Sequence, residues 1–245
     1  KISKWNLSYQ GINPTIIKSL AAYVAVTGSL TSVNVLYNGL DVESADLLLK
    51  VKAEKPNLRT LCGLTHEETE IDCVRNIGAG DAKLLAAEIS FMGSLTSLNL
   101  ERNEIGPDGV VPIGEALKVN DSLTSLSLSQ NYFGPELGTA MAEALKVNGS
   151  LTSLDIGGNN LTNYGHDMTG ITAIAEALKV NGSLKSLNLM DNHIGSDGAK
   201  AFCEALMVNS SLGSLNLRAN RIGPNGAVAI GGALKVNGSL NVNFM

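Results

Sequence analysis

The feature that most constrains this chain is a repeat of 28 residues. The segment 94–121 reads SLTSLNLERNEIGPDGVVPIGEALKVND, and it returns as SLTSLSLSQNYFGPELGTAMAEALKVNG at 122–149. Further copies begin at Ser150, Ser183 and Ser211. A fixed period of about 20–50 residues is typical of a solenoid, in which each unit buries its apolar face against its neighbours. We therefore predict a single solenoid over residues 1–245.

Each unit combines a strand pattern with a helix pattern. In the unit that begins at Leu95, apolar residues alternate at Leu98 and Leu100, which predicts a short strand. Pro112 lies beyond the first turn of the helix that follows, so we expect that helix to start late, near Gly109, or to be irregular. The prolines that fit a first helical turn, where the missing N–H has no partner to lose, are Pro14, Pro107, Pro135 and Pro224.

An asparagine recurs eight residues after the first leucine of most units. Its short amide can satisfy backbone groups of the neighbouring coil at the corner that follows the strand. We predict a column of such amides along the solenoid, in which Gln10 takes this place in the first unit and Asn76 in an irregular one. The asparagines of the column are Asn38, Asn103, Asn131, Asn159, Asn192 and Asn220.

The combined pattern, LxSLxLxxNxI followed by a glycine-containing corner and EALKxN, resembles the leucine-rich repeats of the ribonuclease-inhibitor type. Such repeats also occur in Ran GTPase-activating proteins and in NOD-like receptors. The resemblance covers nearly all of the chain. It implies a right-handed α/β horseshoe with a parallel sheet on the concave face and helices on the convex face. It implies little about the partner, because this fold serves many functions.

One interval between units is longer than the rest. The 37 residues that follow Leu58 contain a strand-like segment at 58–61 with no helix pattern behind it. Because a coil without a helix is thinner on its outer side, we expect the curvature to change there. We therefore predict a possible boundary near 58–67 that divides the solenoid into parts 1–67 and 68–245.

Two further irregularities lie outside the regular coils. The 33-residue interval before Leu184 carries five extra residues within 162–169, which should protrude from the edge where strand turns into helix. Neither end shows a capping pattern, since no Met precedes Lys1 and Met245 stops within a strand-like segment. Solenoid ends need caps, so we expect a fragment of a longer chain or ends covered by a partner.

Composition argues against several kinds of partner. The net charge of −5 and the scattered lysines disfavour nucleic acid. No apolar run approaches the roughly 18 residues of a membrane-spanning helix. Cys62, Cys73 and Cys203 fit neither a disulfide framework nor a zinc site, which indicates an intracellular, cytoplasmic protein.

The Asn-x-Ser sequences between units are interpreted as turns rather than glycosylation sites; they begin at Asn120, Asn148, Asn181, Asn209 and Asn237.

No residue pattern indicates catalysis, a cofactor or a metal. His166 and His193 lie one unit apart, but loops at a solenoid edge commonly carry polar residues, so we predict no metal site. The glycines at 78 and 80 lack the spacing and the Lys-Ser/Thr ending of a phosphate-binding loop. We therefore expect a non-enzymatic protein without a cofactor.

A binding function is predicted from the positions that vary between otherwise constant units. Outward strand positions hold mostly Ser and Asn, whereas the corners carry Tyr, Met and Arg, which are enriched in interfaces. We expect a rigid module that presents its concave face and edge to a protein partner. The alternatives are a GTPase-regulating protein, by resemblance to Ran GTPase-activating proteins, and a structural subunit of a large assembly. The predicted contacts are Arg102, Tyr132, Tyr164, His193, Arg218 and Arg221.

Overall fold

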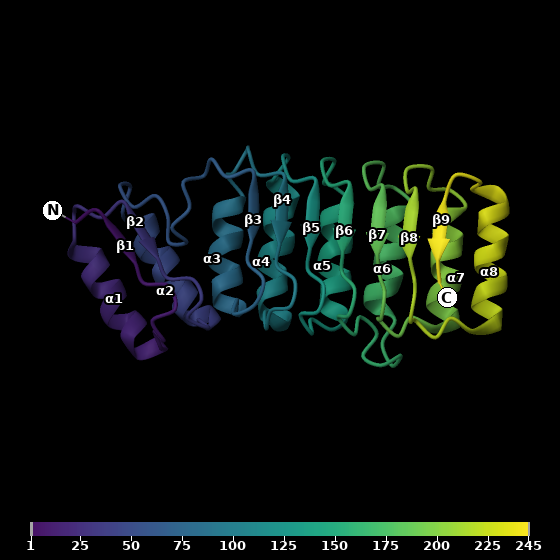
Figure 1. The fold of residues 1–245 in the computed structure, drawn as a ribbon, viewed down its shortest axis with the longest axis horizontal. Helices are drawn as coiled ribbons and strands as arrows, with labels where there is room; N and C mark the ends of the chain where they lie inside the picture. The colour runs from purple at the N-terminus through teal and green to yellow at the C-terminus, as the bar shows by residue number, and fades with distance from the viewer. Residues whose placement is uncertain (1, 245) are drawn as a thin grey trace.

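The computed structural model describes residues 2–244, in which eight helices and nine strands alternate along the chain (Figure 1). The strands are β1 (Lys4–Asn6), β2 (Ser32–Asn34), β3 (Glu70–Asp72), β4 (Ser97–Asn99), β5 (Ser125–Ser127), β6 (Ser153–Asp155), β7 (Ser186–Asn188), β8 (Ser214–Asn216) and β9 (Asn241–Asn243). The helices are α1 (Pro14–Val26), α2 (Val42–Ala53), α3 (Ala79–Ile89), α4 (Gly106–Val119), α5 (Pro135–Leu145), α6 (Thr169–Leu178), α7 (Gly195–Leu206) and α8 (Gly223–Val236).

The strands pair in parallel and in one constant register. Equivalent residues of successive units lie opposite each other, as Leu98, Leu126 and Leu154 do. The larger sheet has the order β3-β4-β5-β6-β7-β8-β9, while β1 and β2 form a separate two-stranded sheet. Each connection within the larger sheet passes through a helix, as parallel neighbours require. Equivalent positions of the repeat therefore form straight columns along the molecule.

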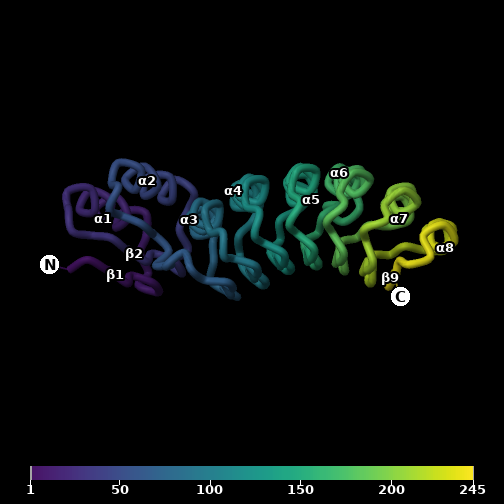
Figure 2. The backbone as a smooth tube through the Cα atoms, turned by 90° about the horizontal axis from the view of Figure 1, so that it is seen from above, coloured from purple at the N-terminus to yellow at the C-terminus, as the bar shows by residue number. Residues whose placement is uncertain are grey.

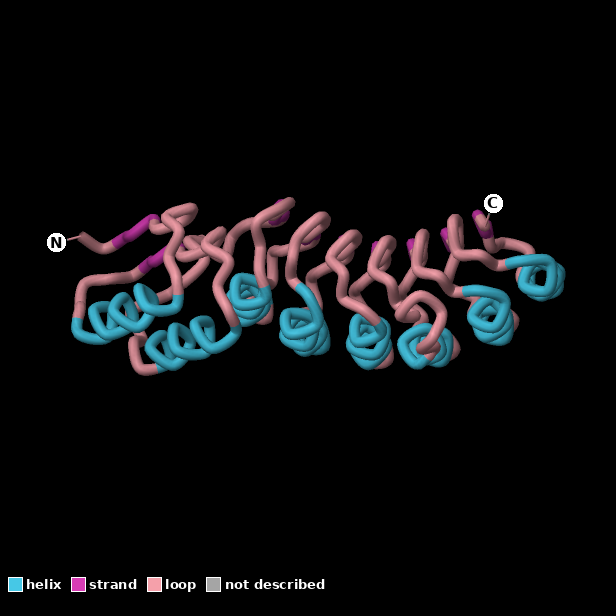
Figure 3. The backbone as a smooth tube through the Cα atoms, turned by 90° about the horizontal axis from the view of Figure 1, so that it is seen from below, coloured by secondary structure: helices cyan, strands magenta, loops and turns pink. Residues whose placement is uncertain are grey.

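The two layers lie on opposite sides of a shallow arc. The strands line its inner side and the helices its outer side (Figures 2 and 3). Between the layers, leucines of successive strands form one continuous core. This arrangement confirms the predicted α/β solenoid. The central leucines of five neighbouring strands, all at most 2% exposed, are Leu98, Leu126, Leu154, Leu187 and Leu215.

The helices begin where the prolines predict. Pro14 and Pro135 are the first residues of α1 and α5, and a proline is the second residue of α4 and α8. The late start considered for α4 is wrong, because this helix is continuous through Pro112. Pro112 has no N–H to donate to the carbonyl of Asp108, so α4 lacks one bond of its ladder. No helix within residues 2–244 is long and apolar enough to span a membrane.

Asparagines close the turn from each helix to the next strand. The amide nitrogen of Asn120 donates to the Ile89 carbonyl at 2.8 Å, and its oxygen accepts from the Leu123 N–H at 2.8 Å. Because a glycosylated amide must be exposed, their burial favours the turn interpretation. Equivalent buried bonds are made by Asn148, Asn181 and Asn209.

The regular stack is interrupted between α2 and α3, where residues 54–69 contain no helix. The segment 58–61 instead adds a rung to β2: the Arg59 N–H donates to the Thr31 carbonyl at 2.8 Å, and the Thr60 carbonyl accepts from the Val33 N–H at 3.0 Å. Only isolated bridges join this rung to β2, so it is shorter than the predicted strand. Among the described strands, β2 and β3 are not paired.

We call residues 2–62 the N-terminal coils, residues 70–244 the main stack, and the contact between them the seam. Figure 3 shows α1 and α2 lengthwise but α3 to α8 end-on, so the helices of the N-terminal coils are inclined to the others. The predicted boundary near 58–67 lies at this interruption. That parts 1–67 and 68–245 behave as separate units stays a prediction.

A close backbone contact joins the two sections on the helix side. The Gly80 N–H of α3 donates to the Leu40 carbonyl at 2.8 Å. A Cβ atom at Gly80 would overlap the carbonyl oxygens of Leu40 and Asp41. Only glycine permits this approach, because any larger residue would separate α3 from the coil before it.

A buried carboxylate joins the two sections near the other end of α3. Glu88, whose side chain is 1% exposed, accepts from the Thr60 hydroxyl at 2.7 Å and from the Leu61 N–H at 2.6 Å. Its oxygens also lie 3.1 Å from His66 Nε2 and 3.5 Å from Lys52 Nζ. Glu88 thus satisfies backbone donors of the helixless rung that a regular neighbouring strand would otherwise pair.

Candidate functional site

The candidate site is the edge of the solenoid at which the strands end. There the chain turns from each strand toward the next helix through a tight corner. We call the series of corners the rim; it comprises residues 8–13, 36–41, 74–79, 101–106, 129–134, 157–168, 190–195 and 218–223.

The asparagine column holds the corners of the rim together. The Asn192 amide nitrogen donates to the Ile156 carbonyl of the preceding coil at 3.0 Å and to the Leu189 carbonyl of its own coil at 3.1 Å. Its oxygen accepts from the Asn159 N–H at 3.0 Å. The same two-carbonyl donor pattern is made by Asn38, Asn103, Asn131, Asn159 and Asn220.

Asn76 does not join the column, contrary to the sequence-based expectation. Its side chain is exposed and its φ is 68°. The reason is the missing corner before it: residues 58–62 turn back without a rim corner, so no carbonyl of a preceding corner lies within reach of this amide. Gln10 stands at the open end of the first coil and donates to the Ser8 carbonyl instead.

The residue before each column position adopts the left-handed backbone conformation. Its φ lies between 55° and 72° at Tyr9, Tyr37, Arg75, Arg102, Gln130, Asp191 and Ala219. This conformation costs an L-residue roughly 1–2 kcal/mol, and the bonds of the column hold it in place. At two corners the left-handed residue is small: Gly158 has no side chain and Ala219 has only a methyl group. The fold therefore does not require the tyrosines and arginines at other corners.

The structure places all six predicted contact residues on the rim. Arg102, Tyr132, Tyr164, Arg218 and Arg221 are exposed, and His193 is half-buried. Arg102 Nε donates to Gln130 Oε1 at 2.8 Å, which orients its guanidinium along the rim. Tyr164 and His193 are brought together, with ring centroids 5.3 Å apart. Arg102 and Tyr132 lie on two separate corners and Arg218 and Arg221 share a third, so the six residues present a broad surface rather than one cluster.

The extra residues of the unit that begins at Leu151 form a projecting loop. It extends beyond the edge of the solenoid below α6 in Figure 1, as the spacing predicted. The Thr162 hydroxyl donates to the Asn192 carbonyl at 3.0 Å, and the Tyr164 N–H donates to Asn160 Oδ1 at 2.7 Å. These bonds attach the loop to the next corner and set Tyr164 beside His193.

The side chains that could hold a metal are His, Cys, Asp and Glu, and of these only Cys could act as a thiol nucleophile. Over residues 2–244 there is no group of three His, Cys, Asp or Glu side chains that could hold a metal. All three cysteines are buried. Burial raises the pKa of the Cys203 thiol to about 11 and that of Cys62 well above its usual range. These two thiols are therefore protonated at neutral pH and offer no thiolate nucleophile.

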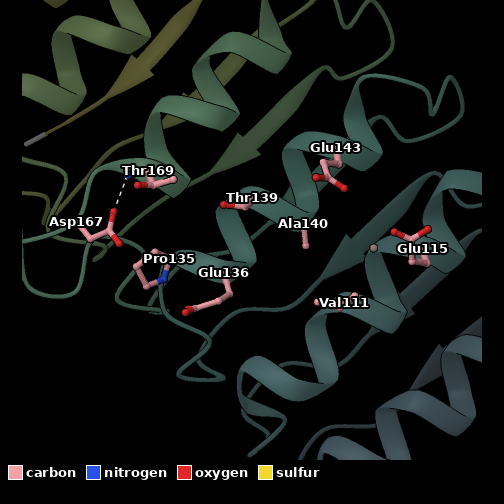
Figure 4. A pocket seen from close by; sticks show the side chains of 10 residues that line it. Val111, Glu115, Pro135, Glu136, Thr139, Ala140, Glu143, Asp167 and Thr169 are labelled. Carbon is pink, nitrogen blue, oxygen red and sulfur yellow. Dashed lines mark hydrogen bonds between the residues drawn. The ribbon is translucent and has the colours of Figure 1, made fainter.

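A second candidate surface lies on the outer face. A groove of about 420 Å³ runs between α4, α5 and the start of α6 (Figure 4). Lys118 Nζ pairs with Glu115 at 2.7 Å and with Glu143 at 2.9 Å. Asp167 accepts from the Thr169 N–H at 2.8 Å. Glu115, Glu143 and Asp167 already have partners within the chain. The groove therefore holds less unpaired negative charge than its number of acidic residues suggests.

Sequence reasoning did not identify the seam as a candidate site. Tyr9 and Tyr37 stack there with ring centroids 4.5 Å apart and planes 2° from parallel. The Tyr37 hydroxyl donates to Cys73 Sγ across the seam at 3.1 Å. The 37-residue interval indicated a missing helix. It did not indicate that two corners from different sections would then face each other.

Comparison with known families identifies the repeat. A family model described as a leucine-rich repeat matches residues 94–114, 147–165, 180–203 and 208–231. Each matched segment contains one strand of the main stack (β4, β6, β7 or β8), and all but 147–165 extend into the helix that follows. No curated protein matches the chain.

The chain is also similar, to different degrees, to solved structures. Leiomodin-1 actin-binding site 2 is 23% identical with a TM-score of 0.50, over 64% of this chain and 88% of that chain. The leucine-rich repeat-containing protein LegL7 from Legionella pneumophila is 19% identical with a TM-score of 0.46, over 98% of this chain and 73% of that chain. The Rad7 and Elc1 complex in yeast is 14% identical with a TM-score of 0.29, over 100% of this chain and 76% of that chain. With its matched repeats, parallel sheet and continuous leucine core, the main stack is built from leucine-rich repeats.

Proposed function

We propose that this protein binds a protein partner through its rim and the adjoining concave face. The observation that carries the proposal is the contrast between uniform strands and varied corners. The first residue of each strand from β4 to β8 is serine. On the rim, by contrast, Tyr132 is 78% exposed and Tyr164 is 66% exposed. Tyr and Arg side chains contribute most to binding energy in many interfaces.

The rim is suited to binding because its backbone is held in place before a partner arrives. Asn131, Asn159 and Asn192 are fully buried and tie each corner to the coil before it. A partner that contacts such a surface does not have to order it, so little conformational entropy is lost on association. The expected function is recognition by a preformed surface, without catalysis.

Capture of native partners tests the proposal. Wild-type protein is compared with a rim variant in which Arg102, Tyr132, His193, Arg218 and Arg221 are all replaced by Ala. A matched control replaces the outer-face residues Glu115, Lys118, Glu136, Glu143 and Lys146 by Ala. Exposed substitutions rarely change stability by more than about 0.5 kcal/mol each, and circular dichroism verifies that both variants fold.

We expect the rim variant to lose at least about tenfold in affinity for the captured partner, because several interface side chains are removed together. The outer-face variant should bind as wild type does. Equal binding by the rim variant and wild type would contradict the proposal, and loss confined to the control would place the site on the helices. A captured GTPase whose hydrolysis is accelerated would replace the binding proposal with GTPase regulation.

A further inference from the structure

Within residues 2–244 the rim is interrupted between the corners 36–41 and 74–79. Elsewhere each corner packs directly on the next, as the column bonds show. The rung at residues 58–62 pairs with β2, but the chain then turns at Gly63, whose φ is 74°, and forms neither a corner nor a helix. The corner after β2 therefore faces the corner after β3 across a groove of about 780 Å³.

Both sections of the solenoid line this seam groove. Tyr9 and Tyr37 come from the N-terminal coils, and Arg75, Arg102 and Glu104 come from the main stack. The whole chain has five tyrosines and five arginines. Two of each lie in this one groove, so it concentrates the side chains best suited to binding a polar partner with an apolar portion.

The tyrosines form a flat aromatic wall. The stacked ring of Tyr9 is 62% exposed and offers a surface for a partner's apolar or aromatic side chain. The hydroxyl of Tyr37 donates to Cys73 Sγ at 3.1 Å, which holds its ring across the seam. Burial and this hydrogen bond raise the pKa of Tyr37 well above its usual range, so the Tyr37 hydroxyl is uncharged at physiological pH.

The arginines form the charged wall. Arg75 is exposed and makes no ion pair with any residue that the structure describes. Arg102 is oriented by Gln130 at 2.8 Å and by Glu101 at 3.2 Å. Guanidinium groups bind carboxylates through paired, charge-assisted hydrogen bonds. Glu104 is the opposing charge of the groove.

We propose that the seam groove binds an acidic peptide segment of the protein partner, with a carboxylate at Arg75 and Arg102 and a neighbouring apolar residue against Tyr9. This inference rests on the proposed protein-binding function and names the chemistry of one contact. The chain as a whole carries a net charge of −5, so a long acidic partner is repelled over most of the surface. A short acidic segment can instead place one carboxylate beside Arg75, which has no ion-pair partner among the described residues.

Labelled peptides test the proposal on the full chain. The probes are capped decapeptides in which Glu or Asp alternates with Leu, Pro or Tyr, together with counterparts in which every Glu is Gln and every Asp is Asn. Fluorescence anisotropy gives the affinity for wild type and for Arg75→Gln, Tyr9→Ala and Glu104→Gln. Arg59→Gln is the matched control, because Arg59 is also an exposed arginine but does not line the groove.

We expect the acidic probes to bind more tightly than their amide counterparts and to weaken as salt is added. Arg75→Gln should lower the affinity about tenfold, since hydrogen bonds to charged groups are the strong ones. Tyr9→Ala should lower it about fivefold through the lost aromatic contact. Glu104→Gln should raise it about twofold or more by removing a like charge, and Arg59→Gln should leave it unchanged.

The opposite signs expected for Arg75→Gln and Glu104→Gln separate recognition from structural damage, because damage would lower the affinity in both. The proposal is overturned if acidic and amide probes bind alike, or if Arg59→Gln weakens binding as much as Arg75→Gln. Tighter binding of a short single-stranded oligonucleotide than of any peptide would also overturn it. If these tests fail while the five-residue rim variant still loses the native partner, the proposed function stands without this contact.

Discussion

The N-terminal coils and the main stack are built from the same unit but are held by different interactions. In the main stack, seven strands pair in one register and the asparagine column ties corner to corner. The seam depends instead on a few particular groups, of which the Glu88 carboxylate and the Gly80 backbone are examples. In a repeated interface many equivalent bonds share the stabilisation, whereas single substitutions at the seam should uncouple the two sections.

The largest expected effect is that of Glu88→Ala. The substitution leaves the buried Leu61 N–H and the Thr60 hydroxyl without their acceptor, and it removes one of the two acceptors of the Cys62 N–H, which keeps the Thr60 hydroxyl oxygen. Unsatisfied buried donors cost about 1–3 kcal/mol each, so we expect a loss of about 3–5 kcal/mol from the N-terminal coils. Trp5, the single tryptophan, lies in β1 and stacks on Tyr23 at 5.2 Å, so its fluorescence reports on those coils alone.

In urea, the Trp5 transition of Glu88→Ala should therefore move to lower concentration and separate from the transition followed by circular dichroism. Glu115→Ala is the control, because Glu115 is exposed and pairs only with Lys118, and surface pairs contribute about 0–1 kcal/mol. Transitions of Glu88→Ala that still coincide, at the wild-type midpoint, would show that the seam does not depend on this carboxylate.

A smaller effect is expected from Asn192→Ala, which tests the column within the main stack. The Asn192 amide donates to the Ile156 and Leu189 carbonyls and accepts from the Asn159 N–H. Removing it should cost about 2–3 kcal/mol, because these buried groups lose their partner. Asn76→Ala, at the exposed position beside the seam, should cost less than about 0.5 kcal/mol. Thermal or urea unfolding measures both; similar losses would contradict the contrast between them.

The smallest effect depends on pH and belongs to Asp81, the third residue of α3, which is buried against the N-terminal coils. Burial raises the pKa of this carboxyl to about 6, although the Gly78 N–H donates to it at 3.2 Å. The folded chain therefore holds the proton more tightly than the unfolded chain. The resulting stability is present below the ordinary pKa of 3.8 and is lost as pH rises through about 6.

Asp81→Asn removes this titration. We expect the variant to be about 1–2 kcal/mol more stable than wild type at pH 7.5 and nearly equal to it at pH 4. Asp108→Asn is the control, since Asp108 is also the third residue of its helix but is exposed. Urea titrations at the two pH values measure the difference. A constant difference between Asp81→Asn and wild type across this range would contradict the assigned pKa.

Much of the main stack follows from sequence, because a repeated unit has a copy of itself on either side. The leucines of the strands, the prolines that open helices and the left-handed corners each recur at a constant spacing, so one unit predicts the next. The six predicted contacts were chosen because the corner residues vary between otherwise constant units, and all six lie on the rim in the structure. The contact between Tyr164 and His193 was not predicted, since it depends on the path of the inserted loop.

The sequence by itself determined the period, the order of strand and helix, the buried leucine columns and the position of the one coil without a helix. Tertiary structure alone decided what that coil brings together. The burial of Glu88, the exposure of Asn76 and the approach of Tyr37 to Cys73 depend on how two sections with different helix directions pack. The physical reason is that periodicity specifies the neighbours of a residue only where the period continues. At the seam, the neighbours of each side chain are set by the three-dimensional packing.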